Sequence, residues 1–347
     1  MLKTVSKQVK YIGQLTKNLK EIIIFSMEKL LEIKNLNLFF GEYQALYDVN
    51  LSLEKGKMHA IAGESGCGKT MTAMSVMRLL PKTALIKSGE IIFNGENLLY
   101  YTDKQMRELR GNKIALIPQD PMTSLNPLYT VGNQLVEAIR AHKKVSYNQA
   151  LRKAKEVLDM VKMPDVENKL NAYPHELSGG MKQRIIIAMA LGTNAELIIA
   201  DEPTTALDVT IQKQIMDLID QIKKELGTTI LLISHDLALI SNYADSISVM
   251  YSGHIVEQAD AEEFFKNTIH PYSQALVNSL PTRNQMLKLK TIEGLPPSIQ
   301  EQISGCKFHP RCDICVSNIC KTQQPILKER TLNHFVSCLI KNSSRVG

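Results

Sequence analysis

The chain has 347 residues, of which 44% are hydrophobic and 22% are charged, so it is long enough for two domains and has the composition of an ordinary soluble globular protein. Residues 1–26 contain five Lys and one Glu and supply +4 of the formal charge of +6, which leaves +2 for the rest. A nucleic-acid binder needs a basic face on its folded domain, so the charge pattern gives no support for such a partner. No apolar run approaches the length that spans a bilayer, and we expect any membrane role to be peripheral.

The lysine-rich extension at 1–26 has apolar side chains three or four positions apart, a pattern that predicts an amphipathic helix. These side chains are Val5, Val9, Ile12, Leu15, Leu19 and Ile22. One interpretation is a basic helix that lies on an anionic membrane surface. The other, which we favour, is a frayed extension before a domain that begins near Met27.

From Leu30 to Leu53 apolar and polar residues alternate, which predicts antiparallel strands that cover one side of a core. Phe40-Gly41 lies on the turn between them. The ring of Phe40 can stack on a purine base through its π-face, or it can serve as ordinary turn packing.

The most informative stretch runs from Gly63 to Thr70 and has the spacing G-x-x-x-x-G-K-T. An apolar run precedes it and a helical pattern continues to Met77, so a strand turns directly into a helix. In this motif backbone N–H groups converge on phosphate oxygens, Lys69 adds a positive charge, and the Thr70 hydroxyl can bind Mg²⁺. The helix N-terminus also favours an anion. The sequence therefore predicts a nucleotide-phosphate site.

Four apolar runs each end in polar residues. They are Met58–Ala62 before the phosphate loop, Ile114–Ile117 before Gln119, Leu197–Ala200 before Asp201 and Glu202, and Thr229–Ile233 before Ser234 and His235. Continuous apolar runs separated by helical segments are typical of a parallel sheet buried on both faces. Ligands bind beyond the carboxyl ends of such strands, so we expect these polar residues to converge on the nucleotide.

Each of these polar side chains has a chemical use beside a triphosphate. Asp201 can hold Mg²⁺, and Glu202 is placed to accept a proton from an attacking water. The Gln119 amide can orient water or bind the metal, or it can be a simple turn residue. His235 can donate a hydrogen bond to the γ-phosphate, although a lone His after a strand is more often structural.

Residues from about 100 to 177 interrupt the strand-rich pattern with helical periodicity, which predicts a helical subdomain inserted into the α/β core. It ends at Leu177-Ser178-Gly179-Gly180, followed by the apolar helix Ile185–Leu191. Ser178 can cap this helix and the glycines leave its N–H groups open, so the sequence predicts a second helix start suited to an anion. A plain Ser-Gly-Gly turn is the alternative.

In this order along the chain, these motifs resemble the nucleotide-binding subunits of ABC transporters. The resemblance covers residues 27–258 and includes Ala206-Leu207-Asp208. It implies an α/β phosphate-loop ATPase with a mainly parallel core sheet, an antiparallel β subdomain, the inserted helical subdomain and, at 259–347, a small cysteine-containing extension. It also implies that two such domains dimerise head to tail, so that the ATP on one subunit is covered by the Ser178 region of its partner.

The resemblance carries residue roles over position by position. The implied ATP-binding residues are Phe40, which stacks on adenine, and Gly63, Glu64, Ser65, Gly66, Cys67, Gly68, Lys69, Thr70, Met71 and Gln119. The implied Mg²⁺ ligands are Thr70, Gln119 and Asp201, and the implied catalytic residues are Glu202, His235 and Lys69. Contacts to the partner's ATP fall to Leu177, Ser178, Gly179, Gly180 and Gln183, and Asp208 lies at the dimer interface. Cys67 replaces a common Ser, with little expected effect because this side chain need not touch phosphate.

The tail narrows the resemblance to the ATPases of oligopeptide and dipeptide importers, a group that also contains nickel importers. The matching segments include His270-Pro271-Tyr272, Gly294-Leu295-Pro296-Pro297 and the stretch Gly305–Cys312, together with Gln119–Pro127. The resemblance implies a peripheral position on the cytoplasmic face of the membrane, a second ATPase subunit that is more often a paralogue, two membrane permeases and, indirectly, an extracellular substrate-binding protein.

The six cysteines do not form a disulfide framework, because Cys67 lies in the phosphate loop and the other five are near the end of the chain; an ATP-using protein also works where thiols stay reduced. The resemblance associates Cys306, Cys312, Cys320 and Cys338 with a [4Fe-4S] cluster, which needs four thiolates. Cys315 allows a zinc site with Cys312, Cys320 and Cys338 instead. Reduced, unligated thiols are another possibility. We rank the [4Fe-4S] cluster first, unligated thiols second and the zinc site third.

The main prediction is the ATP-hydrolysing subunit of a peptide importer. One rival is a nickel or metal-chelate importer, which shares every ATPase motif. The other is a soluble ABC ATPase without a transport role, which the single nucleotide domain and the importer-like tail disfavour. The identity of the transported substrate lies in other polypeptides.

Overall fold

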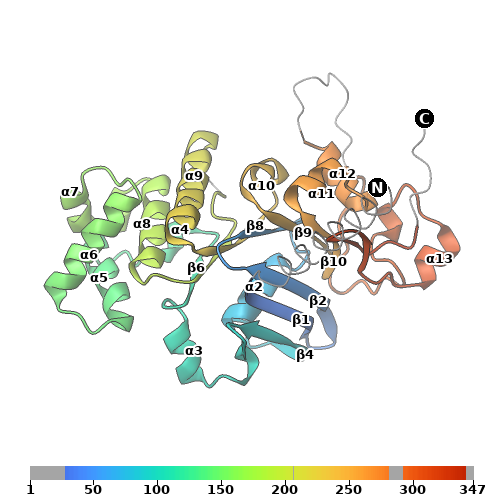
Figure 1. Ribbon diagram of the computed structural model, residues 1–347, viewed down its shortest axis with the longest axis horizontal. Coiled ribbons are helices and arrows are strands. Elements are labelled where there is room, and N and C mark those ends of the chain that lie inside the picture. The colour runs from blue at the N-terminus through green and yellow to red at the C-terminus, as the bar shows by residue number, and fades with distance from the viewer. Residues whose placement is uncertain (1–27, 206, 281–291, 341–347) are drawn as a thin grey trace, which may run out of the picture.

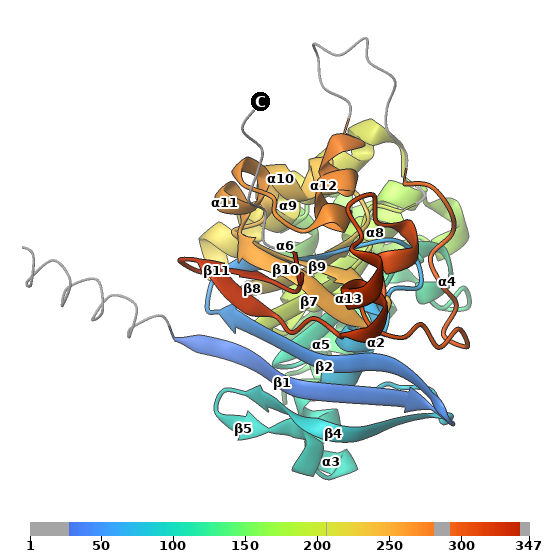
Figure 2. The same cartoon turned by 90° about the vertical axis from the view of Figure 1, so that its right-hand side faces the viewer.

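The computed structural model describes residues 28–205, 207–280 and 292–340. The helix predicted for residues 1–26 lies outside the described residues. Figures 1 and 2 show a central sheet with a second sheet on one side and a helical region at one end of the molecule.

The central sheet has the strand order β11-β12-β10-β9-β3-β8-β7-β6. Its parallel part consists of β3 (Met58–Ala62), β6 (Ile114–Ile117), β7 (Leu197–Asp201), β8 (Thr229–Ser234) and β9 (Ser246–Tyr251). The strands β10 (His254–Asp260), β11 (Lys328–Thr331) and β12 (His334–Val336) extend it in antiparallel fashion. The fold class predicted from the apolar runs is therefore confirmed.

The parallel strands are buried on both faces. Every residue of β3, β7 and β8 is buried, and successive residues of β7 belong to different cores: Ile198 and Ala200 to one, Leu197 and Ile199 to the other. Because side chains alternate across a strand, the sheet separates two hydrophobic layers. This two-sided burial explains why these strands read as continuous apolar runs.

The second sheet has the order β2-β1-β4-β5 and is antiparallel. Its strands are β1 (Lys29–Phe40), β2 (Tyr43–Glu54), β4 (Ala84–Phe93) and β5 (Glu96–Asn97), followed by the short helices η1 (Leu98–Tyr100) and α3 (Asp103–Leu109). Phe40 pairs with Tyr43 across the turn, where Gly41 has φ +58°. The predicted antiparallel strands and the turn at Phe40-Gly41 are confirmed.

The inserted helices gather at one end of the molecule (Figure 1). They are α4 (Pro121–Ser124), α5 (Val131–His142), α6 (Tyr147–Met160), α7 (Val166–Asn171), η2 (Pro174–Glu176) and α8 (Gly179–Gly192). The predicted interval of about 100–177 also contains β6, which pairs with β7 in the central sheet. The helical part therefore starts after Gln119, because strand pairing keeps the apolar run before it in the core.

The remaining helices are α2 (Lys69–Met77), α9 (Val209–Leu226), α10 (Leu237–Tyr243), α11 (Ala261–Lys266), α12 (Pro271–Asn278), η3 (His309–Arg311) and α13 (Ser317–Thr322). β10 runs across the boundary predicted between 258 and 259 and pairs with β12. The strand order places β12 between β10 and β11, and Figure 2 shows β11 on this side of the central sheet. The C-terminal extension thus shares the central sheet. Within the part of the chain that the structure describes, no helix has the length and apolar character needed to cross a membrane.

A buried polar pair joins the extension to this sheet. His334 Nε2 donates to Glu257 Oε1 at 2.8 Å, and both side chains are fully buried. The Glu257 carboxylate also accepts from the backbone N–H groups of Ile269 and His270, at 2.7 and 3.0 Å. Burial opposes the charged imidazole, but the carboxylates of Glu257 and Glu263 raise the pKa of His334. The surrounding carboxylates therefore favour the protonated form of the His334 imidazole.

Candidate active site

The phosphate loop joins β3 to α2 and requires glycine at two positions. Gly63 has φ +151° and a Cβ there would lie 2.3 Å from the Met250 carbonyl oxygen; at Gly68, φ +111°, a Cβ would lie 2.8 Å from the Leu46 side chain. The Lys69 ammonium donates to the carbonyls of Gly63 and Glu64, at 2.8 and 3.0 Å. The lysine thus lies against its own loop, ready to exchange these carbonyls for phosphate oxygens.

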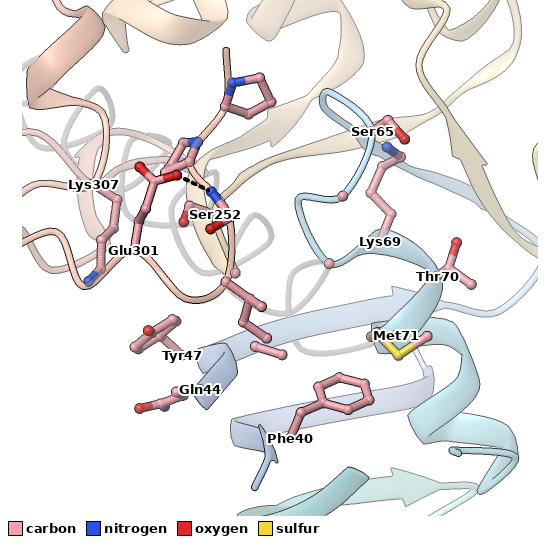
Figure 3. Close-up of a pocket in the computed structure, with 18 of the residues that line it drawn as sticks. Phe40, Gln44, Tyr47, Ser65, Lys69, Thr70, Met71, Ser252, Glu301 and Lys307 are labelled. Carbon is pink, nitrogen blue, oxygen red and sulfur yellow. Dashed lines mark hydrogen bonds between the residues drawn. The ribbon is translucent and has the colours of Figure 1, made fainter. Parts of the chain in front are cut away.

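A cavity of about 550 Å³ opens beside this loop. Eight of the predicted ATP-binding residues line it: Phe40, Ser65, Gly66, Gly68, Lys69, Thr70, Met71 and Gln119. Figure 3 shows the phosphate-loop residues on one side, with Phe40 and Tyr47 below them and Glu301 and Lys307 opposite. Gly63, Glu64 and Cys67 do not line it; the Cys67 side chain is buried in the core, where burial raises the pKa of its thiol. The volume accommodates a nucleotide-sized ligand.

Two oxygen-bearing side chains meet where Mg²⁺ is predicted. Thr70 Oγ1, at the start of α2, donates to Asp201 Oδ1 at 3.2 Å. Burial raises the pKa of Asp201, and the neighbouring Glu202 charge adds to this effect while the Thr70 hydrogen bond opposes it. A bound cation offsets such a desolvation cost, and hydroxyl and carboxylate oxygens are the donors that Mg²⁺ prefers. The residues present fit the predicted ion.

Glu202 lies at the centre of a polar group. Its Oε2 accepts from Gln119 Nε2 at 3.2 Å and from Thr205 Oγ1 at 2.9 Å, and lies 3.3 Å from His235 Nδ1. The Glu202 backbone has φ +47°, a region that costs about 1 kcal/mol or more for a non-glycine residue and is often found at functional sites. The turn after β7 thus places the carboxylate at the cavity, where it can accept a proton from water.

Most of the polar residues expected to converge lie close together, but Asp201 and His235 do not line the cavity, and the Ser234 hydroxyl accepts from the Asp236 N–H. Residues that follow β3, β6, β7 and β8 meet at one edge of the sheet: Thr70 contacts Asp201, and Gln119 and His235 contact Glu202. This is the edge at which parallel strands end.

The Ser178 segment lies elsewhere. Ser178 caps α8, accepts a hydrogen bond from the Met181 N–H at 3.4 Å and is exposed. Helix α8 starts beside α9. The two helices approach so closely that a Cβ added to Gly180 would lie 2.8 Å from Ile211 Cγ2. Asp208, also exposed, caps α9 and accepts from the Ile211 N–H at 3.0 Å. Neither residue lines the phosphate-loop cavity. The helix cap predicted at Ser178 is confirmed.

Gln183 does not fit its predicted role. The side chain is fully buried, and its amide nitrogen and oxygen have no hydrogen-bond partner. A contact from this side chain to a partner's ATP is incompatible with this placement. The preceding turn carries exposed Ser178, whereas helix packing turns Gln183 inward.

Burial has the largest effect on the pKa values of Cys306 and Cys312 in the C-terminal extension. It raises the pKa of Cys306 to about 11 and that of Cys312 to about 12, with neighbouring cysteines adding to both effects. Across the described ranges no group of three or more His, Cys, Asp or Glu side chains is arranged to hold a metal ion. Neither the iron–sulfur nor the zinc prediction gains support.

Sequence reasoning missed part of the cavity wall. Gln44, Ala45, Tyr47, Ser252 and Gly253 line it, as do Pro296, Pro297, Ser298, Ile299, Glu301 and Lys307 from the C-terminal extension. The tail motifs contained several of these residues, but nothing in their spacing indicates the nucleotide. Only tertiary packing brings the extension to the phosphate loop.

A phosphate loop at a helix start, with a metal-binding pair and a hydrogen-bonded glutamate at the ends of neighbouring parallel strands, limits the protein to one class. It is a phosphate-loop ATPase that uses ATP with Mg²⁺.

Comparison with known proteins identifies the family within this class of ATPases. The family model "ABC transporter" matches residues 46–205, and the model "Oligopeptide/dipeptide transporter, C-terminal region" matches residues 256–320. The chain is 48% identical over 320 residues to a probable peptide ABC transporter ATP-binding protein, y4tR of Sinorhizobium fredii, with 90% of this chain and 95% of the relative covered. It is 42% identical over 319 residues to the oligopeptide transport ATP-binding protein OppD of Bacillus subtilis, with 90% and 89% covered.

A solved dimer of the ATP-binding cassette MJ0796, in a post-hydrolysis state bound to ADP and Pi, superposes with a TM-score of 0.60 at 27% identity, covering 67% of this chain and 99% of that one. The chain belongs to the family of ATP-binding subunits of peptide ABC importers.

Proposed function

We propose that this subunit hydrolyses ATP in the cavity beside Lys69 and that hydrolysis drives the uptake of dipeptides or oligopeptides. The observation that carries the assignment is the convergence of Gln119, Thr205 and His235 on the Glu202 carboxylate. In this role Lys69 and the phosphate loop bind the triphosphate, and Phe40 stacks on the adenine. Thr70, Asp201 and Gln119 hold Mg²⁺, which would neutralise phosphate charge.

Glu202 is the proposed base and accepts a proton from the attacking water, while His235 donates a hydrogen bond to the γ-phosphate. Glu202→Gln should retain ATP binding and lose hydrolysis by about 100-fold or more, the usual contribution of a general base. Glu225→Gln on α9 is the matched control, because Glu225 is exposed and, among the residues that the structure describes, its side chain pairs only with neighbouring Gln221. Undiminished turnover in Glu202→Gln would contradict the assignment of the base.

A second ATPase subunit completes the site in this proposal. The exposed cap of α8 at Ser178, with Gly179 and Gly180 behind it, offers open N–H groups to the partner's ATP, and exposed Asp208 lies at the contact between subunits. Leu177, which is buried, positions this turn instead of touching nucleotide. A similar ATP-binding cassette was solved as a dimer, which supports the pairing of two subunits. We favour a paralogue as the second subunit.

The subunit then works at the cytoplasmic face of the membrane, bound to two permease subunits, and an extracellular binding protein supplies the substrate. Peptide is favoured over nickel because the similar relatives carry peptide names and the tail matches a peptide-transporter model. Uptake of labelled dipeptide and of nickel, compared in a deletion strain and its complemented form, separates the two. Loss of nickel uptake with intact peptide uptake overturns the peptide assignment.

The set Cys306, Cys312, Cys320 and Cys338 stays a prediction for a [4Fe-4S] cluster. Four thiolates from one small module are the ligand set that such a cluster needs. Protein purified without oxygen should then contain four irons per chain and absorb broadly in the visible range. Iron-free, colourless protein removes the prediction.

A further inference from the structure

An ion pair joins the C-terminal extension to the phosphate loop. Arg311, at the end of η3, directs both terminal nitrogens at the Glu64 carboxylate: Nη1 donates to Oε2 at 2.7 Å and Nη2 to Oε1 at 3.0 Å. The Arg311 side chain is only 6% exposed and that of Glu64 26%. This two-pronged geometry is the strong form of an arginine–carboxylate contact.

The guanidinium has little freedom to move. Its Nε donates to the Glu293 carbonyl at 2.9 Å and Nη2 to the Gly294 carbonyl at 3.1 Å. Nη1 also lies 3.4 Å from the Tyr251 hydroxyl. These backbone carbonyls fix the orientation of the Arg311 guanidinium. Arg311 therefore restricts the position of the Glu64 side chain.

The C-terminal extension also forms a hydrogen bond to the backbone of Glu64. The Glu64 N–H donates to the Tyr272 hydroxyl at 2.9 Å. Tyr272 lies on α12, is fully buried, and packs with Tyr251 and Phe308 at ring-centre distances of 4.7 and 5.3 Å. The first turn of the phosphate loop is thus fixed by two side chains from the C-terminal extension.

A free carboxylate at this position would work against ATP. Glu64 follows Gly63 directly, and its carbonyl accepts from the Lys69 ammonium at 3.0 Å. Although Glu64 does not line the cavity, a negative charge on the phosphate loop repels a triphosphate bound by that loop, and incomplete water screening strengthens the repulsion. Arg311 cancels that charge. Other residues of the extension, Pro297, Ile299 and Lys307, line the cavity beside the phosphate loop, and Figure 3 shows Lys307 there.

We propose that Arg311 is a positioning residue for ATP: it acts through Glu64, whose charge it neutralises and whose backbone turn it helps to fix, and so the C-terminal extension sets the affinity of the phosphate loop for nucleotide. The inference rests on the proposed function of this cavity as the ATP site. It gives the extension a part in nucleotide binding.

The test compares the affinities of full-length protein for ATP, ADP and AMP by titration calorimetry. Arg311→Met should weaken ATP binding about tenfold, ADP binding less and AMP binding least, because repulsion by unpaired Glu64 grows with the ligand's charge. Adding Glu64→Gln to Arg311→Met should recover most of the lost affinity, and Arg311→Lys should retain most of it. Glu64→Gln by itself removes the repelling charge and should bind ATP at least as well as the unmodified protein.

Arg330→Met is the matched control. Arg330 lies on β11 of the same extension, donates to the Cys338 carbonyl and does not line the cavity, so its substitution should leave nucleotide affinity unchanged. Equal losses for ATP and AMP in Arg311→Met, or a double variant no better than the single one, overturn the inference. If the unmodified protein binds none of the three nucleotides, the proposed function fails. Unchanged affinity in Arg311→Met defeats this inference only.

Discussion

Gln119 and Glu202 lie 83 positions apart in the chain, yet Gln119 Nε2 donates a hydrogen bond to Glu202 Oε2 at 3.2 Å. Gln119 follows β6 and Glu202 follows β7, two strands that pair in parallel. The contact therefore links the start of the inserted helical region to the proposed base.

Gln119→Leu should lower kcat for ATP hydrolysis about tenfold while ATP affinity changes less than threefold, since a single orienting hydrogen bond of this kind contributes about 1 kcal/mol. Steady-state hydrolysis and nucleotide titration measure the two quantities. Gln134→Leu, within the helical region, is a control for general disturbance, because within the described part of the chain the Gln134 side chain bonds only to the loop at Asn126 and Tyr129. A tenfold loss of ATP affinity with unchanged kcat would be the opposite of the expected result.

Thr70→Val should raise the Mg²⁺ concentration needed for half-maximal hydrolysis several-fold, because the variant keeps the shape of the side chain and loses the hydroxyl that meets Asp201. Thr70→Ser restores the hydroxyl and should restore the Mg²⁺ requirement. A magnesium titration of ATPase activity in the three proteins measures this. Identical curves for Val and Ser would argue that the hydroxyl has no part in metal binding.

Gly63→Ala should abolish nucleotide binding or prevent folding of the loop, because the added Cβ would lie 2.3 Å from the backbone oxygen of Met250. Gly227→Ala is the matched control: Gly227 also has a positive φ, +65°, but a Cβ there meets nothing within 4 Å. That variant should lose only about 1 kcal/mol of stability. Nucleotide titration and thermal unfolding of both variants separate the effect of the steric clash at Gly63 from the effect of a positive φ, which both glycines share.

His334→Leu should reduce the free energy of unfolding by about 3 kcal/mol, because it leaves the fully buried Glu257 carboxylate without its charged partner. Loss of the β10–β12 contact should make the extension the first part to open, which hydrogen exchange at β12 reports. Exposed His175→Leu, on η2, is the control. A loss below 1 kcal/mol would mean that the pair contributes little to docking of the extension.

The same pair predicts a pH dependence. Since the folded-state pKa of His334 lies above its usual value of 6.5, the protonated pair stabilises the fold fully below pH 6.5, and this contribution is lost as pH rises through the raised pKa. The stability difference between the unmodified protein and His334→Leu should therefore shrink from pH 6 towards alkaline pH. Denaturant unfolding at several pH values measures it, and a difference that grows with pH contradicts the sign.

Local patterns were sufficient for much of the fold. The residues Met58–Ala62 form β3 as predicted, and Ser178 caps α8. Apolar runs and cap residues act over a few neighbouring positions, so their effect is visible in the sequence. The run Ile114–Ile117 lies inside the interval predicted for the helical insertion, although its apolar pattern also predicted a strand of the parallel sheet, and its pairing with β7 confirms the strand.

The burial or exposure of individual side chains was harder to predict from the sequence. Gln183 and Ser178 are five positions apart on one motif, but helix packing buries the first and leaves the second exposed. Which face of α8 turns inward depends on its neighbours α5, α6 and α9, and the mixed spacing of Gly, Lys and Gln gives no periodic signal for it.

The sequence by itself determined the chemistry: a glycine-rich loop for phosphate, an acidic pair after a buried strand and the order of motifs that defines the family. These depend on residue type and short spacing, which the chain carries directly. Only the tertiary structure decided that Arg311 meets Glu64, 247 positions away, and that the C-terminal extension forms a wall of the cavity beside the phosphate loop. Contacts of that kind arise when β12 joins β10 and the buried aromatic residues pack together, and such long-range packing leaves no periodic trace in the sequence.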